Sequence, residues 1–400
     1  MSKRVLIITQ NFYPEIGSAG NRMKNIYLLL QDKGFDVDVL TTDPTYPTKK
    51  IYDDSQFWDH DGLNNDALHI ERVKMKNKKY SRSILKRLMY YLEMAIKMFF
   101  SVVKSRKKYD IVYTTSPAIF IAIVGLIAKI KYKSRLILEI RDLWPESLKG
   151  VGVFDKPIIL KVFKEIENLL YKKADSIVVN SEGFIDYIKK QSDQFEDKIT
   201  YIPNGARIHE LSMNNESVGP FKVIYAGNIG LAQDDEILMQ LAKELNKKNI
   251  EFTIIGYGIR RQGLQDYIHK ENLQNVTFLK PLSRKECLQI IAEHHVGVVT
   301  LAEKDVFKTV LPGKIIDYMS CGIPIVASVS GFAKKVIMEE NAGFVSEENN
   351  ASELLKYIDI FYQNPELRDE IGNNALTYVK ERFLWESNIE SLVKVMNNNI

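Results

Sequence analysis

The chain has 400 residues, of which 45% are hydrophobic and 26% charged, and its 55 basic and 51 acidic side chains leave a net charge of +4. These values exclude a disordered or collagen-like chain, and roughly 150 residues per domain predict two domains. The two cysteines, Cys287 and Cys321, are too few for a disulfide framework or a thiolate zinc site. Since no signal-peptide core follows Met1, we expect a cytoplasmic protein.

Short β-branched runs alternate with amphipathic helical stretches in the first half of the chain, a pattern typical of strand–helix–strand units on a parallel sheet. A helix over residues 21–33 is expected to end at Gly34, a residue type favoured just after helices. The irregular stretch from Pro203 to Pro220 predicts a hinge between two domains. The expected strands span residues 5–9, 37–41, 111–114, 136–140 and 176–179.

The segment from Glu71 to Lys108 is strongly basic, with thirteen basic and two acidic residues and a charge of +11, which leaves −7 for the rest. Its apolar part, Ile84 to Val103, contains too many charges to span a bilayer and favours an amphipathic helix on an anionic membrane surface. The alternative is a surface helix packed on its own domain. Nucleic-acid binding is a third and less favoured interpretation, because no nucleic-acid-binding motif accompanies the charge. The expected membrane contacts are Lys78, Lys79, Arg82, Lys86, Arg87, Phe99 and Phe100.

A second alternating series follows the hinge, and Ser283 with Glu286 forms a capping box that predicts a helix start. We therefore predict an α/β protein of two Rossmann-like domains, residues 1–203 and 204–384. Two such sheets would face each other across a ligand-binding cleft at the carboxyl ends of their strands. The expected strands of the second half span residues 222–226, 252–255, 276–279, 296–300, 325–327 and 343–345.

Three glycine turns come after predicted strands and before predicted helices, where free backbone amides can face a phosphate. Each turn alone is also explained by local chain reversal, and the dinucleotide-binding spacing of glycines is absent. Three such turns together indicate a phosphate-bearing ligand, most simply a nucleotide. Their candidate residues are Gly17 and Ser18, then Gly227, Asn228 and Gly230, then Gly256 with the neighbouring Arg260 and Arg261.

Two further sites carry charge. Pro312, Gly313 and Lys314 open a helix whose amides and amine can stabilise a leaving phosphate, and Asp317 could accept hydrogen bonds from ribose hydroxyls or be an ordinary surface aspartate. After the strand over 136–140 comes a cluster that indicates substrate contact or catalysis, unless Asp142 is a helix cap and Trp144 a core residue. The cluster consists of Arg141, Asp142 and Glu146.

The sequence gives little indication of a metal. Its six histidines lack metal-ligand spacing. Asp36 and Asp38 resemble a D-x-D motif but lie in an alternating strand, and a second match, Asp59-His60-Asp61, has no supporting context. No metal ligand and no cofactor are therefore expected.

Several of these residues together resemble glycosyltransferase family 4, of GT-B fold, and most closely its N-acetyl-L-fucosamine transferase subgroup of bacterial O-antigen and capsule assembly. The resemblance implies a retaining, metal-independent enzyme with the nucleotide-sugar on the second domain and the acceptor on the first. It also implies a final helix, within 385–400, that crosses back to the first domain. The matching motifs lie at residues 13–17, 141–146, 203–205, 225–230 and 314–324.

The sequence departs from this family at two places. Where the family has two glutamates eight positions apart, this chain has Thr309 and Asp317, so only the carboxylate that resembles the ribose ligand is kept. Where the family has an Arg and Lys pair after the glycine turn, this chain offers Gln233. Lys314, with Arg260 or Arg261, would then neutralise the diphosphate.

These observations predict a glycosyltransferase that moves an N-acetylated deoxysugar from a UDP-sugar to a polyprenyl-diphosphate-linked acceptor. It would be peripheral on the inner face of the cell membrane and bind no nucleic acid. Asp142 would orient the acceptor, supported by Arg141 and Glu146. Two alternatives remain: a UDP-N-acetylhexosamine 2-epimerase-like enzyme, and a non-catalytic nucleotide-sugar-binding subunit of an envelope assembly complex.

Overall fold

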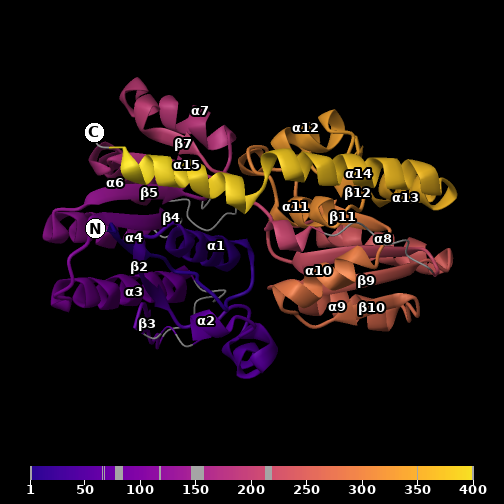
Figure 1. Cartoon of the computed structure of the whole chain (residues 1–400). Helices are drawn as coiled ribbons and strands as arrows, with labels where there is room; N and C mark the ends of the chain where they lie inside the picture. Colours follow the sequence, from indigo (N-terminus) through magenta and orange to yellow (C-terminus); the bar gives the residue numbers. More distant parts are fainter. Residues whose placement is uncertain are drawn as a thin grey trace. The chain divides into compact units, whose positions relative to one another are not determined.

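The computed structural model describes residues 2–64, 66, 68–76, 84–116, 119–145, 157–211, 219–348 and 350–398. The chain divides into two compact units (Figure 1). Unit 1 holds Met1–Pro203 and Glu386–Ile400, and unit 2 holds Asn204–Trp385. Among the predicted site residues, Glu146, Lys78, Lys79 and Arg82 lie outside the described residues.

Unit 1 is built on a seven-stranded parallel sheet of order β3-β2-β1-β4-β5-β6-β7. Its central strands are buried on both faces, which explains their nearly continuous apolar sequence. The strands are β1 (Arg4–Ile8), β2 (Asp36–Thr42), β3 (Ile70–Val73), β4 (Ile111–Ser116), β5 (Arg135–Ile140), β6 (Ser176–Val179) and β7 (Ile199–Tyr201).

The helices of unit 1 include the end of the chain, because α15 (Trp385–Asn397) packs there almost entirely. Its Met396 carbonyl accepts a hydrogen bond from Lys3 at 3.0 Å, and its Asn388 donates to Pro203 at 3.1 Å. α1 ends as predicted, with Gly34 at φ +84° just beyond it. The other helices are α1 (Ser18–Asp32), α2 (Asp61–Asn64), α3 (Ile84–Lys104), α4 (Ile119–Tyr132), α6 (Pro157–Lys173) and α7 (Gly183–Lys189).

Unit 2 has a six-stranded parallel sheet of order β10-β9-β8-β11-β12-β13. Its strands are β8 (Lys222–Asn228), β9 (Glu251–Tyr257), β10 (Val276–Leu279), β11 (Val296–Thr300), β12 (Ile325–Ser328) and β13 (Gly343–Val345). Its helices are α8 (Asp235–Lys247), α9 (Arg261–Lys270), α10 (Arg284–Ala292), α11 (Gly313–Ser320), α12 (Gly331–Glu339), α13 (Ala351–Gln363) and α14 (Pro365–Arg382).

Local sequence explains several helix starts in unit 2. The predicted capping box is present, since Ser283 accepts from the Glu286 amide while the Glu286 carboxylate accepts from the Ser283 amide at 3.2 Å. Asp234 caps α8 in the same way, accepting from Ile237 at 3.1 Å. Both sheets are parallel with helical connections, so the predicted pair of Rossmann-like units is confirmed.

Candidate active site

A buried amine lies at the start of α11. The Nζ atom of Lys314 has no hydrogen-bond partner among the described residues and lies 3.7 Å from the centre of the Tyr225 ring. Burial lowers the pKa of this amine to about 7, and the charge of Asp317 only partly opposes the shift. The amine is thus placed to gain a proton when a negative group binds beside it.

The glycine turn that begins at the end of β8 packs directly against this lysine, and Gly227 and Asn228, which were expected after the strand, are the last two residues of β8. Gly227 has φ +133°, and a Cβ atom there would stand 3.4 Å from Cε of Lys314. Both the backbone conformation and the close approach therefore favour glycine. Within the same turn the Gly230 amide donates to Oε1 of Gln233 at 2.9 Å, and the Tyr225 hydroxyl donates to the Asn228 carbonyl at 2.8 Å. The structure thus brings together two regions that the sequence predicted separately.

The helix start itself offers backbone donors. Pro312 is the residue before the first helical residue, Gly313, and as proline it has no side-chain acceptor to cap the first turn. Thr309, half-buried, lies in the loop just before it. This loop is held against α12 because the Phe332 amide donates to the Lys308 carbonyl at 2.7 Å.

The two predicted arginines of the third glycine turn are engaged by unit 2 itself. Arg260 forms an ion pair with Asp235. Arg261 donates from Nε to the Gly256 carbonyl at 3.1 Å and lies over the Phe278 ring. Gly256 lies within β9 rather than in a turn after it, and it has a packing role, because a Cβ there would come within 3.0 Å of Phe278. Lys314 is therefore the predicted cation that the structure places at the end of β8, against Gly227.

Asp317 is held by a residue that sequence reasoning missed. Arg284, the first residue of α10, donates from Nη1 to Asp317 at 3.0 Å and from Nε and Nη2 to Glu210 at 2.6 and 2.9 Å. Burial raises the pKa of Asp317, and the charge of Arg284 opposes this. Arg284 stands inside the predicted capping box, but nothing local indicates partners 33 and 74 positions away.

In unit 1 the predicted Arg141 follows β5 beside a buried ion pair. Arg22, on α1, pairs with Glu139 of β5, and their side chains are 1% and 0% exposed. Arg22 also donates to the carbonyls of Ile202 and Pro203 at 2.9 and 2.8 Å. Burial lowers the pKa of Arg141; Glu139 opposes this shift, whereas the charge of Arg22 adds to it. Glu139 thus pairs with Arg22, and its charge also acts on the nearby Arg141.

The next residues of this loop place an aromatic ring in the core. Trp144 is 7% exposed and contacts Tyr91 of α3 edge-on at 5.8 Å. Asp142 is half-buried, and its charge contributes to the raised pKa of Tyr91, for which burial is the main cause. Trp144 is therefore a core residue, as the structural alternative predicted. Asp142 lies on the same loop, two residues before it.

The first glycine turn leads into α1. Gly17, at φ +108°, precedes the helix, and Ser18 is exposed at its first position with no side-chain cap. A Cβ at Gly20 would collide with the Glu15 carbonyl oxygen, at 2.2 Å. The turn is therefore tight as well as open to solvent at Ser18.

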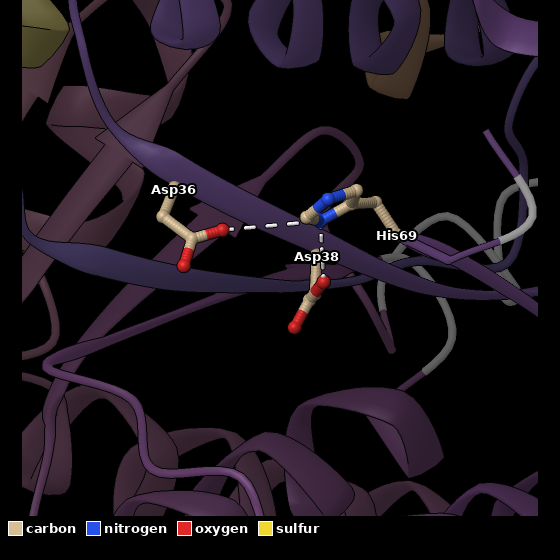
Figure 2. Close-up of side chains that lie close together, drawn as sticks. All are labelled: Asp36, Asp38 and His69. Atoms are coloured by element: carbon tan, nitrogen blue, oxygen red, sulfur yellow. Dashed lines mark hydrogen bonds and ion pairs between the residues drawn. The ribbon is translucent and has the colours of Figure 1, made fainter.

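Asp36, Asp38 and His69 are close enough to suggest a metal site, with one ligand atom of each within 4.8 Å of the others (Figure 2). Oδ2 of each aspartate accepts from other donors, and Oδ1 of Asp38 lies 2.9 Å from Nδ1 of His69. Asp36 accepts from Arg4 at 2.6 Å, and Asp38 accepts from Lys107 at 2.8 Å and the Tyr109 hydroxyl at 2.7 Å. Burial by itself would raise the pKa of Asp38, but these donors lower it by more, so the pKa lies below its usual value. We interpret the cluster as a salt-bridge network at the amino end of β2.

The predicted amphipathic helix is present as α3. Lys86 and Phe100 are exposed, whereas Arg87 and Phe99 are half-buried. Among the helices that the structure describes, none is both long and apolar enough to cross a membrane.

Comparison with known proteins places the whole arrangement in a family. A model of the group 1 glycosyl transferases matches residues 209–378, and a model of the glycosyl transferase 4-like domain matches residues 17–205. The fold of a sucrose-phosphate synthase from Thermosynechococcus elongatus superposes with a TM-score of 0.72, at 16% identity, over 98% of both chains. The chain belongs to the GT-B glycosyltransferases. The predicted fold and general activity are thereby confirmed.

Two further proteins are similar to this glycosyltransferase. One is a relative named for colanic acid biosynthesis, the glycosyl transferase WcaI of Escherichia coli, 23% identical over 80% of this chain and 81% of its own. The other is HepE of Anabaena, whose structure in complex with UDP-glucose superposes with a TM-score of 0.71 at 16% identity, over 98% of this chain and 99% of that one.

Proposed function

We propose that this glycosyltransferase is a retaining, metal-independent enzyme that transfers an N-acetylated deoxysugar, such as N-acetyl-L-fucosamine, from a UDP-sugar to a polyprenyl-diphosphate-linked sugar. It acts in capsule or O-antigen assembly on the inner face of the cell membrane and needs no cofactor. Relatives named for colanic acid and teichuronic acid biosynthesis support the pathway class. The HepE structures with UDP and UDP-glucose support the donor class.

The observation that carries the proposal is the unpaired amine of Lys314 beside the turn at Gly227. Burying an ammonium group is costly, and the charge of Asp317 offsets this cost only in part, so a diphosphate would supply the negative charge that is still needed. The start of α11, which Pro312 does not cap, favours an anionic group of the same kind. As the bond between the sugar and the diphosphate breaks, these donors stabilise the growing negative charge.

On the donor side, Asp317 accepts hydrogen bonds from the ribose hydroxyls. Arg284 fixes one of its oxygens, Oδ1, and leaves the other for the ribose. Glu210 accepts two hydrogen bonds from Arg284, at Nε and Nη2, and balances its charge. Arg284 is therefore a positioning residue that acts through Asp317.

On the acceptor side, Asp142 orients the attacking hydroxyl toward the face of the sugar that the diphosphate leaves. Burial and the charge of Arg22 lower the pKa of Arg141, and although Glu139 opposes this, an anionic group nearby would favour its charged form further. The diphosphate of a lipid-linked acceptor is such a group.

The proposal predicts a defined product when the protein is incubated with a panel of UDP-sugars and polyprenyl-diphosphate-sugar acceptors. Mass spectrometry should show one sugar added to the acceptor, and NMR should show that the donor's anomeric configuration is kept. Addition of EDTA should not slow the reaction. A free epimerised sugar would establish the epimerase alternative, and UDP binding without turnover across the panel would establish the non-catalytic one.

The same assay with Asp142→Asn checks the acceptor assignment. Losing a positioned carboxylate should lower kcat by about a hundredfold or more. The affinity for UDP should stay unchanged, because Asp142 belongs to the other unit from Lys314. Normal turnover by this variant would remove Asp142 from the site.

A second prediction concerns Arg284→Met. Without its partner, Asp317 should bind the ribose poorly, and the Kd of UDP should rise about tenfold, since a hydrogen bond to a charged group contributes roughly 1.5–3 kcal/mol. Calorimetry should show that the variant and the wild type bind 2′,3′-dideoxy-UDP with equal affinity. A merely structural role for Arg284 would weaken both ligands alike. Glu210→Gln, which keeps the bond to Asp317, is the matched control and should change the Kd less.

A further inference from the structure

The outer side of α3 carries a stripe of exposed apolar side chains. Their spacing of three and four residues puts them on one face of the helix. The opposite face is buried in the core of unit 1 through Tyr90, Met94, Met98 and Val102. The exposed residues are Met89, Leu92, Ile96, Phe100 and Val103, each between 43% and 55% exposed.

A second stripe of this kind lies on α6, which the sequence had not singled out. Ile158, Val162 and Leu169 are 79%, 53% and 47% exposed, while Phe163 and Leu170 are buried on the inner side. α3, α4 and α6 all belong to connections that run the same way across the sheet, so right-handed crossovers place them on one face. α4 contacts both of the other helices, and its Ile130 is 70% exposed.

The charges around these stripes are almost all positive. Among the described side chains of the three helices, Glu165 is the one exposed acid. Glu93 and Glu167 are paired with Lys97 and Lys164, at 2.6 and 2.8 Å. The exposed basic residues are Lys86, Lys104, Lys131, Lys161, Lys172 and Lys173.

We propose that α3, α4 and α6 together form a docking surface for a lipid bilayer with anionic headgroups, in which α6 contributes as much as α3. This layer is called the three-helix face below. Exposed apolar stripes with basic borders match the two parts of such a bilayer, acyl chains and negative headgroups. Monomeric proteins rarely leave two apolar stripes exposed on one layer without a partner. The inference rests on the proposed function, which supplies the lipid-linked acceptor.

An aromatic cluster connects the three-helix face to the loop of Asp142. Tyr91 of α3 stacks on Phe120 of α4 at 6.1 Å, and Phe163 of α6 contacts Phe120 at 6.2 Å and Trp144 at 6.0 Å. Each of the three helices thus touches the ring system that includes Trp144. Docking of the face therefore holds the Asp142 loop at a fixed height above the bilayer, where the sugar of a lipid-linked acceptor lies.

Vesicle flotation tests the surface. The wild type should bind phosphatidylcholine vesicles that contain phosphatidylglycerol and bind pure phosphatidylcholine much less. The double variant Val162→Ser with Leu169→Ser should bind the anionic vesicles roughly tenfold more weakly, and Ile96→Ser with Phe100→Ser should behave alike, since binding scales with buried apolar area. The control, Met338→Ser with Tyr362→Ser in unit 2, removes side chains that are as exposed (49% and 54%) and should bind normally.

Three results would overturn the proposal. In the first, the α6 variant binds as the wild type does while the α3 variant does not, so that α3 alone is the docking element. In the second, the wild type does not bind anionic vesicles, and light scattering shows that the wild type is an oligomer and the α6 variant is not, so that the face is a protein interface. In the third, the control loses binding to the same degree.

Transfer to a water-soluble, short-chain acceptor separates this inference from the proposed function. The α6 variant should keep full activity on that acceptor without vesicles and lose activity on long-chain acceptor in anionic vesicles. If no acceptor is ever glycosylated but the α6 variant still loses vesicle binding, the proposed function is wrong and the three-helix face stands.

Discussion

Replacing Lys314 by methionine is expected to lower kcat/KM for the nucleotide-sugar by about two to three orders of magnitude without making the protein less stable. The loss of activity follows because the amine is the cation at the end of β8, where the diphosphate is proposed to bind. Stability is kept because methionine fills a similar volume and removes a buried polar atom that has no hydrogen-bond partner in the described structure. Steady-state kinetics and urea unfolding measure the two effects separately.

The pH dependence of stability gives this prediction a second measurement. The pKa of Lys314 falls from 10.5 to about 7 in the folded protein. Between these values the unfolded chain holds a proton that the folded chain has released, so the free energy of unfolding of the wild type rises with pH across this window. The stabilisation by Lys314→Met should therefore be greatest below pH 7 and shrink toward pH 10. A difference between variant and wild type that does not change with pH would contradict the assignment.

Binding of UDP should be accompanied by protonation of Lys314. At pH 8 the free amine is mostly neutral, and a bound diphosphate would raise its pKa, so UDP binding should take up most of one proton. Calorimetry in buffers of different ionisation enthalpy measures this uptake, which Lys314→Met should abolish. Lys308→Met is the matched control, because Lys308 is exposed, pairs with Asp305 and lies in the loop before α11. Equal proton uptake by both variants would place the diphosphate elsewhere.

Those parts of the fold that depend on local pattern were predictable. Buried parallel strands give continuous apolar runs, and glycine or capping residues mark the helix ends, so most strands and the helix ends at Gly34 and Ser283 follow from the sequence. The edge strand β3 was missed because Ile70–Val73 is short and half charged. An edge strand needs no long apolar run, since only one neighbour pairs with it.

The candidate site divides in the same way. Gly227 and Lys314 could be proposed from sequence because the ends of neighbouring parallel strands meet at one edge of a sheet. Arg284 could not, since its role depends on side chains that only the tertiary fold brings to it. The stripe on α6 was missed because three apolar side chains among charged ones look like the inner face of any helix. Only their measured exposure shows that they point outward.

Arg22→Met is expected to destabilise unit 1 by about 3–5 kcal/mol, the usual effect of removing one partner of a buried ion pair. The variant leaves Glu139 buried with no partner on α1. It also removes the two hydrogen bonds to the carbonyls of Ile202 and Pro203, although Asn388 still donates to Pro203. Urea unfolding followed by tryptophan fluorescence, to which the core residue Trp144 of unit 1 contributes, reports on this loss.

Two further variants separate charge from hydrogen bonding at this pair. Arg22→Lys keeps the positive charge but cannot donate to three acceptors in a fork, so its stability should lie between those of the wild type and Arg22→Met. Arg22→Met combined with Glu139→Gln removes both charges and should recover part of the loss. Arg141 would then lack its balancing carboxylate, so the double variant should bind anionic acceptors differently from the wild type while binding UDP normally. If Arg22→Met unfolds at the same urea concentration as the wild type, another group balances the charge of Glu139 when Arg22 is absent. Arg141 would then lack the excess positive charge on which the acceptor assignment depends.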